Sequence, residues 1–129
     1  MSEPLRGVIV AHSDLAAALV AAVQRISGVG PEALVALSNE GLGPGGIRDR
    51  LDELVGDHPA VIFSDLKGGS CGMAARQLCG SRPGNGLVTG VNLAVLLDFV
   101  MNREMPMAEL LERLQERGRA AIEALPARD

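Results

Sequence analysis

A histidine and an aspartate each stand just beyond an apolar, strand-like run of the sequence. His12 follows the run at residues 5–11, and Asp65 comes shortly after the run at residues 60–63. In an open parallel sheet, ligands bind at the edge where the strands have their carboxyl ends. A carboxylate beside an imidazole accepts a hydrogen bond from one ring N–H and leaves the lone pair of the other nitrogen free as a nucleophile, base or metal ligand. His12 and Asp65 are therefore our candidate catalytic pair.

The segment after Asp65 has the features of a phosphate site. Gly68 and Gly69 allow backbone N–H groups to approach a ligand closely, and Ser70 adds a hydroxyl at the N-terminus of an expected helix, beside the positive end of its dipole. Together with the histidine and the aspartate, this cradle fits phosphorylation of His12 better than hydrolysis. Hydrolysis needs a second base or a metal to activate water, and we identify no His, Asp and Glu trio for such a metal, so we expect no metal and no cofactor.

Two further polar residues are expected to support this edge of the sheet. Ser13 follows His12 directly, and we expect it chiefly to cap the next helix. Asn92 follows another apolar run, at residues 86–90. A single histidine at a strand end is more often structural than functional, so the functional interpretation depends on all these residues meeting at one edge.

The elements that must position these residues alternate between short apolar runs and amphipathic helical patterns. This alternation indicates an α/β fold with an open parallel sheet between two helical layers. In the flavodoxin-like strand order 2-1-3-4, the first and third strands are neighbours, which would bring His12 next to Asp65. We expect four parallel strands, at residues 5–11, 33–37, 60–63 and 86–90. We expect helices at residues 13–26, 47–55, 71–78, 93–101 and 107–116. The last segment, from Gly118 to Leu125, fits a helix or an edge strand.

Composition excludes several classes of protein. The chain has 129 residues, a size typical of one domain, and its 12 Lys and Arg against 16 Asp and Glu give a net charge of −4. An acidic chain with two Phe, no Tyr and no Trp is a poor nucleic-acid binder. No apolar run has the roughly 20 residues that a membrane span needs, and the N-terminus does not resemble a signal peptide. We therefore expect one cytoplasmic domain over residues 1–129, without membrane insertion.

Two other sequence features are given their simpler interpretations. Residues 41–46 match the dinucleotide-binding pattern G-x-G-x-x-G, but this pattern should follow the first strand, and here it contains Pro44. We expect a flexible loop there, and nucleotide binding is the third-ranked hypothesis for the function. Cys71 and Cys79 match no common zinc motif or disulfide framework, so we expect two reduced thiols on a helix.

Three segments in order carry a resemblance to a known family. The chain resembles the mannose-type (mannose/fructose/sorbose) IIA proteins of the bacterial phosphoenolpyruvate-dependent sugar phosphotransferase system. The segment G-V-I-V-A-H-S, at residues 7–13, is similar to the family's strand that ends in the phosphorylated histidine. The family's D-x-x-G-G-S-P-x-N-A-A signature is similar to the segment from Asp65 to Ser70 together with Ala74 and Ala75. Its G-V-N-L-P-M-L-L-E segment is similar to residues 90–98.

The resemblance implies a phosphotransferase component with a phosphohistidine intermediate. His12 would accept a phosphoryl group from the phosphocarrier HPr and pass it to a separate IIB protein for sugar uptake, and Asp65 would hydrogen-bond His12. The resemblance also implies a homodimer in which the segment from Gly118 to Leu125 is an antiparallel edge strand exchanged between subunits. The alternative is a regulatory phospho-acceptor module that reports the phosphotransferase state to a partner protein.

The chain departs from the family pattern around the expected site. Cys71 stands where the family usually has Pro, and Gly72 and Met73 replace a pair such as Phe-Asn. These changes spare the histidine and the carboxylate but alter the rim of the site, so they leave the partner and the transport system open. The sugar is open as well, since its recognition belongs to membrane components outside this chain.

Overall fold

Four parallel strands form one sheet in the order β2-β1-β3-β4, as expected from the sequence. The structure is a computed structural model and describes residues 3–127. Its strands are β1 (Arg6–Ala11), β2 (Leu34–Ser38), β3 (Ala60–Ser64) and β4 (Gly86–Thr89). Because β1 and β3 are the central pair, the segments that carry His12 and Asp65 leave the sheet side by side.

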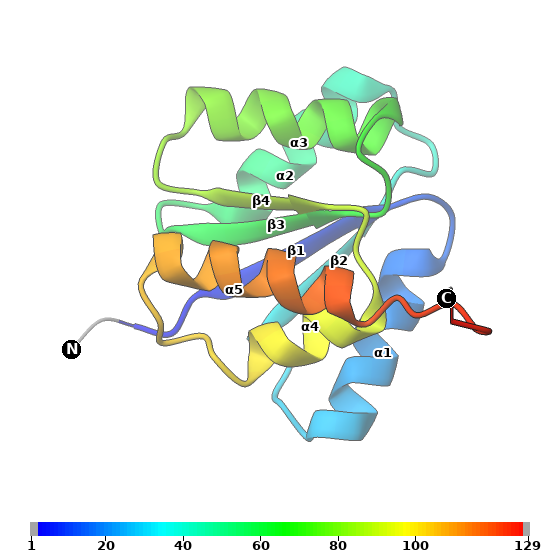
Figure 1. The fold of residues 1–129 in the computed structure, drawn as a ribbon. Coiled ribbons are helices and arrows are strands. Elements are labelled where there is room, and N and C mark those ends of the chain that lie inside the picture. Colours follow the sequence, from blue (N-terminus) through cyan, green and yellow to red (C-terminus); the bar gives the residue numbers. More distant parts are fainter. Residues whose placement is uncertain (1–2, 128–129) are drawn as a thin grey trace.

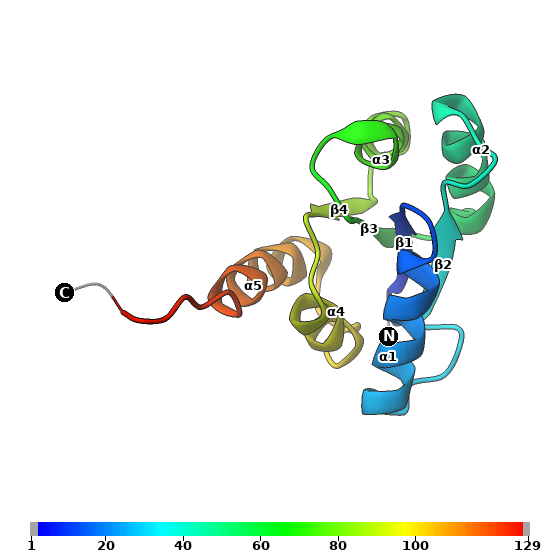
Figure 2. The same ribbon diagram turned by 90° about the vertical axis from the view of Figure 1, so that its right-hand side faces the viewer.

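Helices cover both faces of the sheet, which gives three layers (Figures 1 and 2). The helices are α1 (Leu15–Ser27), α2 (Pro44–Val55), α3 (Gly69–Ser81), α4 (Leu93–Val100) and α5 (Met107–Ala120). Helices α2 and α3 lie on one face, and α1, α4 and α5 lie on the other. No helix in the described residues is long and apolar enough to cross a membrane.

The central strand β1 shows how sequence alternation builds the two cores. Val8 and Val10 pack into the cluster under α2 and α3, whereas Ile9 and Ala11 pack into the cluster under α1, α4 and α5. Side chains alternate between the two faces of a strand, so a continuous apolar run is needed where both faces are covered. The strand is consequently buried up to Ala11, the residue that precedes His12.

The glycine-rich segment at residues 41–46 is not a loop throughout, so that expectation was wrong for its second half. Helix α2 begins at Pro44 and includes Gly45 and Gly46. Proline is well suited to the first helical position, because its φ is preset and its missing N–H would have no partner within the helix. The segment follows β2, whereas a dinucleotide-binding glycine loop should follow the first strand, so its position does not favour nucleotide binding.

The segment from Gly118 to Leu125 begins as part of a helix. Helix α5 continues to Ala120, so the expected edge strand was wrong for residues 118–120. Arg117 and Arg119 lie in the last turn of α5, where positive charge stabilises the helix dipole. Residues 121–127 are irregular and lead away from the body of the molecule, with the Ile122 and Leu125 side chains exposed (Figure 2).

Candidate active site

His12 and Asp65 are in direct contact at the carboxyl end of the sheet. Val10 of β1 is in register with Ser64 of β3, so the next residues of each strand leave the sheet together. One carboxylate oxygen of Asp65, Oδ2, accepts a hydrogen bond from the ring Nδ1 of His12 at 2.7 Å and another from its backbone N–H at 2.9 Å. The contact therefore fixes the ring and the main chain of His12 to the same carboxylate.

The charge state of Asp65 determines which ring nitrogen of His12 carries the proton. Burial alone would raise the pKa of Asp65, but the hydrogen bonds from His12, the attraction of its ring and the hydrogen bond from the Leu66 N–H together outweigh burial and hold that pKa below its usual value. An ionised carboxylate can only accept hydrogen bonds, so the proton of a neutral His12 lies on Nδ1. The lone pair of Nε2 is then free. The His12 side chain is 40% exposed and the Asp65 side chain only 10%, so the ring is accessible while its partner is sheltered.

The second oxygen of Asp65 is also held by the backbone. Its Oδ1 accepts a hydrogen bond from the N–H of Leu66 at 3.0 Å, and the Ser64 hydroxyl donates to the carbonyl of Leu66 at 2.8 Å. Both carboxylate oxygens thus face N–H donors. This arrangement orients the carboxylate before any ligand binds.

The predicted phosphate-binding residues lie at the N-terminus of α3, beside the His12 ring. Gly68 is the N-cap residue, so no side chain caps the first turn of α3 in the described residues. A Cβ atom on Gly69 would lie 3.8 Å from Cε1 of His12. Gly69 has φ +75°, a conformation that side chains other than glycine rarely adopt. Gly69 and Ser70 therefore begin a helix whose positive end lies near the candidate nucleophile.

Gly72 packs the first turn of α3 closely against the loop that follows Asp65. A Cβ atom at Gly72 would lie 2.6 Å from the carbonyl oxygen of Lys67 and 2.8 Å from that of Leu66. Both contacts are with backbone atoms, which cannot move aside as a flexible side chain could. Gly72, which has no Cβ atom, thus allows the loop to lie directly on the helix.

We expect Gly72→Ala to lower the free energy of unfolding by about 2 kcal/mol, because an added methyl group in a packed site forces the surroundings to shift. Gly80, near the other end of α3, has nothing within 4 Å of a built Cβ. Gly80→Ala is the matched control and should raise stability by about 0.5 kcal/mol, since alanine favours the helix. Urea unfolding followed by circular dichroism measures both. Equal effects of the two variants would contradict the close contact.

Ser13 does not cap α1, and the expectation that it would was wrong. The N-cap is Asp14, and Ser13 has φ 55°, in the left-handed region. Its backbone N–H donates to Oδ1 of Asn39 at 3.0 Å, and its carbonyl accepts from the Ser38 hydroxyl at 2.8 Å. These contacts from the end of β2 impose the turn, and backbone strain of this kind is often found at functional sites.

Asn92 has a structural use in this chain. Its side-chain oxygen accepts a hydrogen bond from the N–H of Val95 at 2.9 Å and so caps α4. Its amide nitrogen donates to the carbonyl of Gly118 at 3.0 Å, which ties α4 to the end of α5. Both polar groups of the Asn92 side chain are thus engaged in holding helices together.

Cys71, which sequence analysis placed at the rim of the expected site, lies directly beside the histidine and the aspartate. Its sulfur, one ring nitrogen of His12 and one carboxylate oxygen of Asp65 all lie within 4.8 Å of one another. Cys71 is fully buried in the first turn of α3. Burial first, and then the charge of Asp65, raise the pKa of the Cys71 thiol. No spacing motif links residues 12, 65 and 71, so only the fold could reveal this group.

A family comparison matches most of the chain. The family model described as "PTS system fructose IIA component" matches residues 7–115. A search of curated proteins found no match.

Solved structures with the same fold were found in several bacteria. One is the phosphotransferase system component EIIA from Streptococcus agalactiae, at 21% identity over 93% of this chain and 96% of that chain, with a TM-score of 0.85. Another is the mannose/sorbose specific IIA subunit of the phosphotransferase system from Enterococcus faecalis, at 24% identity over 98% of both chains and a TM-score of 0.83. A sigma-54 interaction domain protein from Enterococcus faecalis is similar at 11% identity over 93% of this chain and 94% of that chain, with a TM-score of 0.75.

Proposed function

The chain belongs to the mannose-type IIA family of the phosphoenolpyruvate-dependent sugar phosphotransferase system, whose members relay phosphoryl groups in sugar uptake, and from this we propose that His12 is its phosphoryl acceptor. In this proposal His12 takes the phosphoryl group from phospho-HPr and passes it to a separate IIB protein in the cytoplasm. The observation that carries the proposal is the 2.7 Å contact between Nδ1 of His12 and the Asp65 carboxylate. That contact leaves Nε2 as the nucleophile.

The transfer needs only one bond to form and one to break. The lone pair of Nε2 of His12 attacks phosphorus, and the bond between phosphorus and the donor's ring nitrogen breaks, returning its electron pair to the donor ring. Positive charge then develops on the His12 ring, where the ionised Asp65 carboxylate stabilises it. The protein contributes positioning and electrostatic stabilisation, which are the main requirements of phosphoryl transfer.

The N-terminus of α3 is the part of this proposal that holds the phosphoryl oxygens. The N–H groups at Gly69 and Ser70 and the Ser70 hydroxyl would donate to them, with Gly68 leaving room at the N-cap. The positive end of the helix dipole favours an anion at this position. The nearness of Gly69 to the His12 ring supports this assignment.

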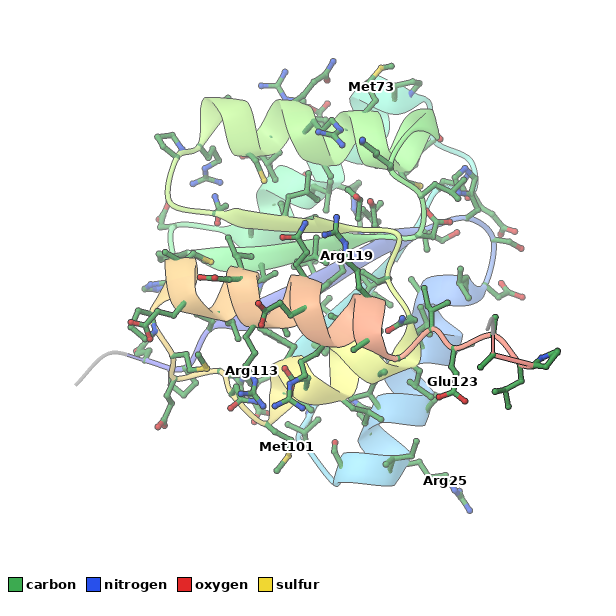
Figure 3. The ribbon with its side chains drawn as sticks, viewed as in Figure 1. Arg25, Met73, Met101, Arg113, Arg119 and Glu123 are labelled. Atoms are coloured by element: carbon green, nitrogen blue, oxygen red, sulfur yellow. The ribbon has the colours of Figure 1, made fainter. Side chains whose placement is uncertain are left out.

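Exposed apolar side chains near the site support docking of protein partners. Leu66 is 57% exposed in the loop after Asp65, and Met73 is 54% exposed on α3, with its side chain directed outward from the helix (Figure 3). Methionine is enriched and charged side chains are depleted at the centre of protein interfaces. We propose that HPr and the IIB protein bind over this part of the surface in turn.

We also propose that the chain forms a homodimer through its last residues. Strand β4 is at the edge of the sheet, and a groove of about 430 Å³ runs beside it, with Val88, Leu111 and Ile122 among its lining residues. An open strand edge readily accepts another strand. In this proposal residues 121–125 of each subunit pair with β4 of the other, as an exchanged antiparallel edge strand.

Ending the chain after Ala120 should convert the proposed dimer into a monomer, because the exchanged residues are then missing. Sedimentation equilibrium on the full chain and on the shortened chain measures this, with circular dichroism as the check that both are folded. A full chain that is monomeric at micromolar concentration would contradict the exchange, and so would a shortened chain that stays dimeric.

The relay is tested by reconstitution. The full chain is incubated with phosphoenolpyruvate, enzyme I and HPr, and its intact mass is recorded at neutral to alkaline pH, where phosphohistidine survives. We expect a mass increase of one phosphoryl group that disappears when HPr is omitted. A mass unchanged under these conditions would overturn the proposed acceptor function.

A regulatory role is the second candidate. The same fold occurs in a sigma-54 interaction domain protein at 11% identity, so the fold by itself is compatible with a regulatory protein. Both roles require phosphorylation of His12, and they differ in the fate of the phosphoryl group. A chase of the phosphorylated protein with a IIB protein distinguishes them: rapid loss of the phosphoryl group indicates transport, whereas retention indicates regulation.

A further inference from the structure

Three side chains of different chemistry converge from separate segments at the end of the sheet. His12 follows β1, Asp65 follows β3, and Cys71 lies in the first turn of α3. One ligand atom from each lies within 4.8 Å of the other two. It is the one group of three or more potential metal ligands among residues 3–127.

We propose that His12, Asp65 and Cys71 form a binding site for Zn²⁺. This combination of an imidazole nitrogen, a carboxylate oxygen and a thiolate sulfur suits a borderline-soft ion, whereas Mg²⁺ and Ca²⁺ prefer oxygen ligands alone. Three protein ligands leave a fourth tetrahedral position, which water can occupy. The sequence expectation of no metal rested on the lack of a His, Asp and Glu trio and of a cysteine zinc motif, whereas the proposed site combines His12, Asp65 and Cys71 from three segments that the fold brings together.

Small movements would bring the three atoms into tetrahedral geometry. Ligand bonds of about 2.0–2.3 Å around Zn²⁺ place the ligand atoms about 3.3–3.6 Å apart. The nitrogen and oxygen of the 2.7 Å pair would have to separate slightly, and the sulfur would have to approach by up to about 1.2 Å. The His12 side chain is 40% exposed, so its ring has room for this adjustment.

The surroundings hold two of the ligands in place. The Asp65 carboxylate accepts hydrogen bonds from the backbone N–H groups of His12 and Leu66, and such partners orient metal ligands. Cys71 is held where the helix lies directly on the loop, through the close contact at Gly72. Binding of the ion releases the thiol proton of Cys71 to solvent and leaves a thiolate bound to Zn²⁺.

Zn²⁺ at this site would block phosphoryl acceptance, a consequence that rests on the proposed relay function. If the ion binds Nε2 of His12, it occupies the lone pair that should attack phosphorus. If it binds Nδ1, the ring proton moves to Nε2, with the same result. The site would therefore make this IIA protein sensitive to Zn²⁺ through Cys71, a residue at a position where the family usually has Pro.

The binding itself is tested without reference to phosphorylation. The full chain, kept reduced, is titrated with Co²⁺ as a spectroscopic substitute and with Zn²⁺ by calorimetry. We expect one ion per chain and a near-ultraviolet thiolate-to-cobalt charge-transfer band. Cys71→Ser should abolish the band and weaken Zn²⁺ binding by at least about 100-fold, since loss of an outer-shell partner alone costs 10–100-fold. Cys79→Ser, on the same helix, should retain both signals.

A second variant, His12→Gln, keeps the test of Zn²⁺ binding valid if Cys71→Ser does not fold. His12→Gln alters an exposed side chain and should also weaken Zn²⁺ binding, with the fold monitored by circular dichroism. Absence of the charge-transfer band in the unsubstituted chain, or a band that survives Cys71→Ser, overturns the Zn²⁺ site. The ratio of phosphorylation rates with and without Zn²⁺ is then measured for the unsubstituted chain, Cys71→Ser and Cys79→Ser. Zn²⁺ binding without phosphorylation contradicts only the relay function, and phosphorylation without Zn²⁺ binding contradicts only the metal site.

Discussion

Replacing His12 with glutamine should abolish phosphorylation of the protein in the reconstituted system. Glutamine can still donate a hydrogen bond to Asp65, but its amide nitrogen has no lone pair available to attack phosphorus. The expected mass spectrum therefore contains only the unmodified chain, at every incubation time. This is the largest effect we expect from any single substitution, because no other residue in the site replaces the lost nucleophile.

The second histidine of the chain provides a matched control. The sequence contains two histidines, and His58 is exposed in the turn before β3. His58→Gln removes an imidazole from a distant surface and should leave phosphorylation at the unsubstituted level. If His12→Gln still gains a phosphoryl group, or if His58→Gln loses it, the assignment of the acceptor is wrong.

Replacing Asp65 with asparagine should slow phosphorylation by about 10³-fold or more, comparable to the loss seen when the aspartate that orients a catalytic histidine is changed to asparagine in serine proteases. The physical reason lies in the N–H donors that surround this carboxylate. Its Oδ2 faces the ring and backbone N–H groups of His12, and its Oδ1 faces the N–H of Leu66. An asparagine amide must direct its own NH₂ toward one of these donors.

Either orientation of that amide harms the site. With NH₂ toward His12, the ring must accept at Nδ1, so its proton moves to Nε2 and the nucleophile is lost. With NH₂ toward Leu66, two donors oppose each other and the loop is displaced. In both cases the negative charge that stabilises the phosphorylated ring is gone.

Single-turnover transfer from phospho-HPr measures the effect of Asp65→Asn, and a thermal melt checks that the variant is folded. Asp14→Asn is the control, because Asp14 is exposed near the site and its side chain makes no capping hydrogen bond in the described structure. We expect the control to transfer at the unsubstituted rate. A loss of less than tenfold for Asp65→Asn would show that the carboxylate does not orient the nucleophile.

The parallel sheet could be predicted from the sequence because it depends on local patterns, and the pairing of His12 with Asp65 followed once a flavodoxin-like strand order was adopted. Continuous apolar runs such as residues 60–63 are typical of strands covered on both faces, and helical patterns between them require a parallel sheet. Once the strand order 2-1-3-4 was inferred, the ends of the first and third strands had to be neighbours. The candidate pair was thus a consequence of that strand order. The period-two and period-3.6 patterns indicate the strands and helices, and the order itself was taken from the flavodoxin-like arrangement.

The ends of the elements were predicted less well, because distant contacts determine them. Ser13 has the residue type of an N-cap, yet hydrogen bonds from Ser38 and Asn39 draw it into a left-handed turn. Helix α5 extends through residues 118–120, where the sequence was equally compatible with a strand. In each case the local preference was weak and contacts elsewhere in the chain decided the outcome.

The sequence by itself therefore determined the fold class and the identity of the candidate nucleophile and its carboxylate. The strand order was taken from the flavodoxin-like arrangement, and the structure confirms it. Only the tertiary structure decided which atoms meet: the direction of the His12 ring, the donors around Asp65, and the presence of Cys71 beside both. Residues 12, 65 and 71 lie on three segments, and their separation in space depends on how β1, β3 and α3 pack. Side-chain periodicity indicates which face of an element is buried, but distances of a few ångströms between elements are set by packing, as the contact at Gly72 shows.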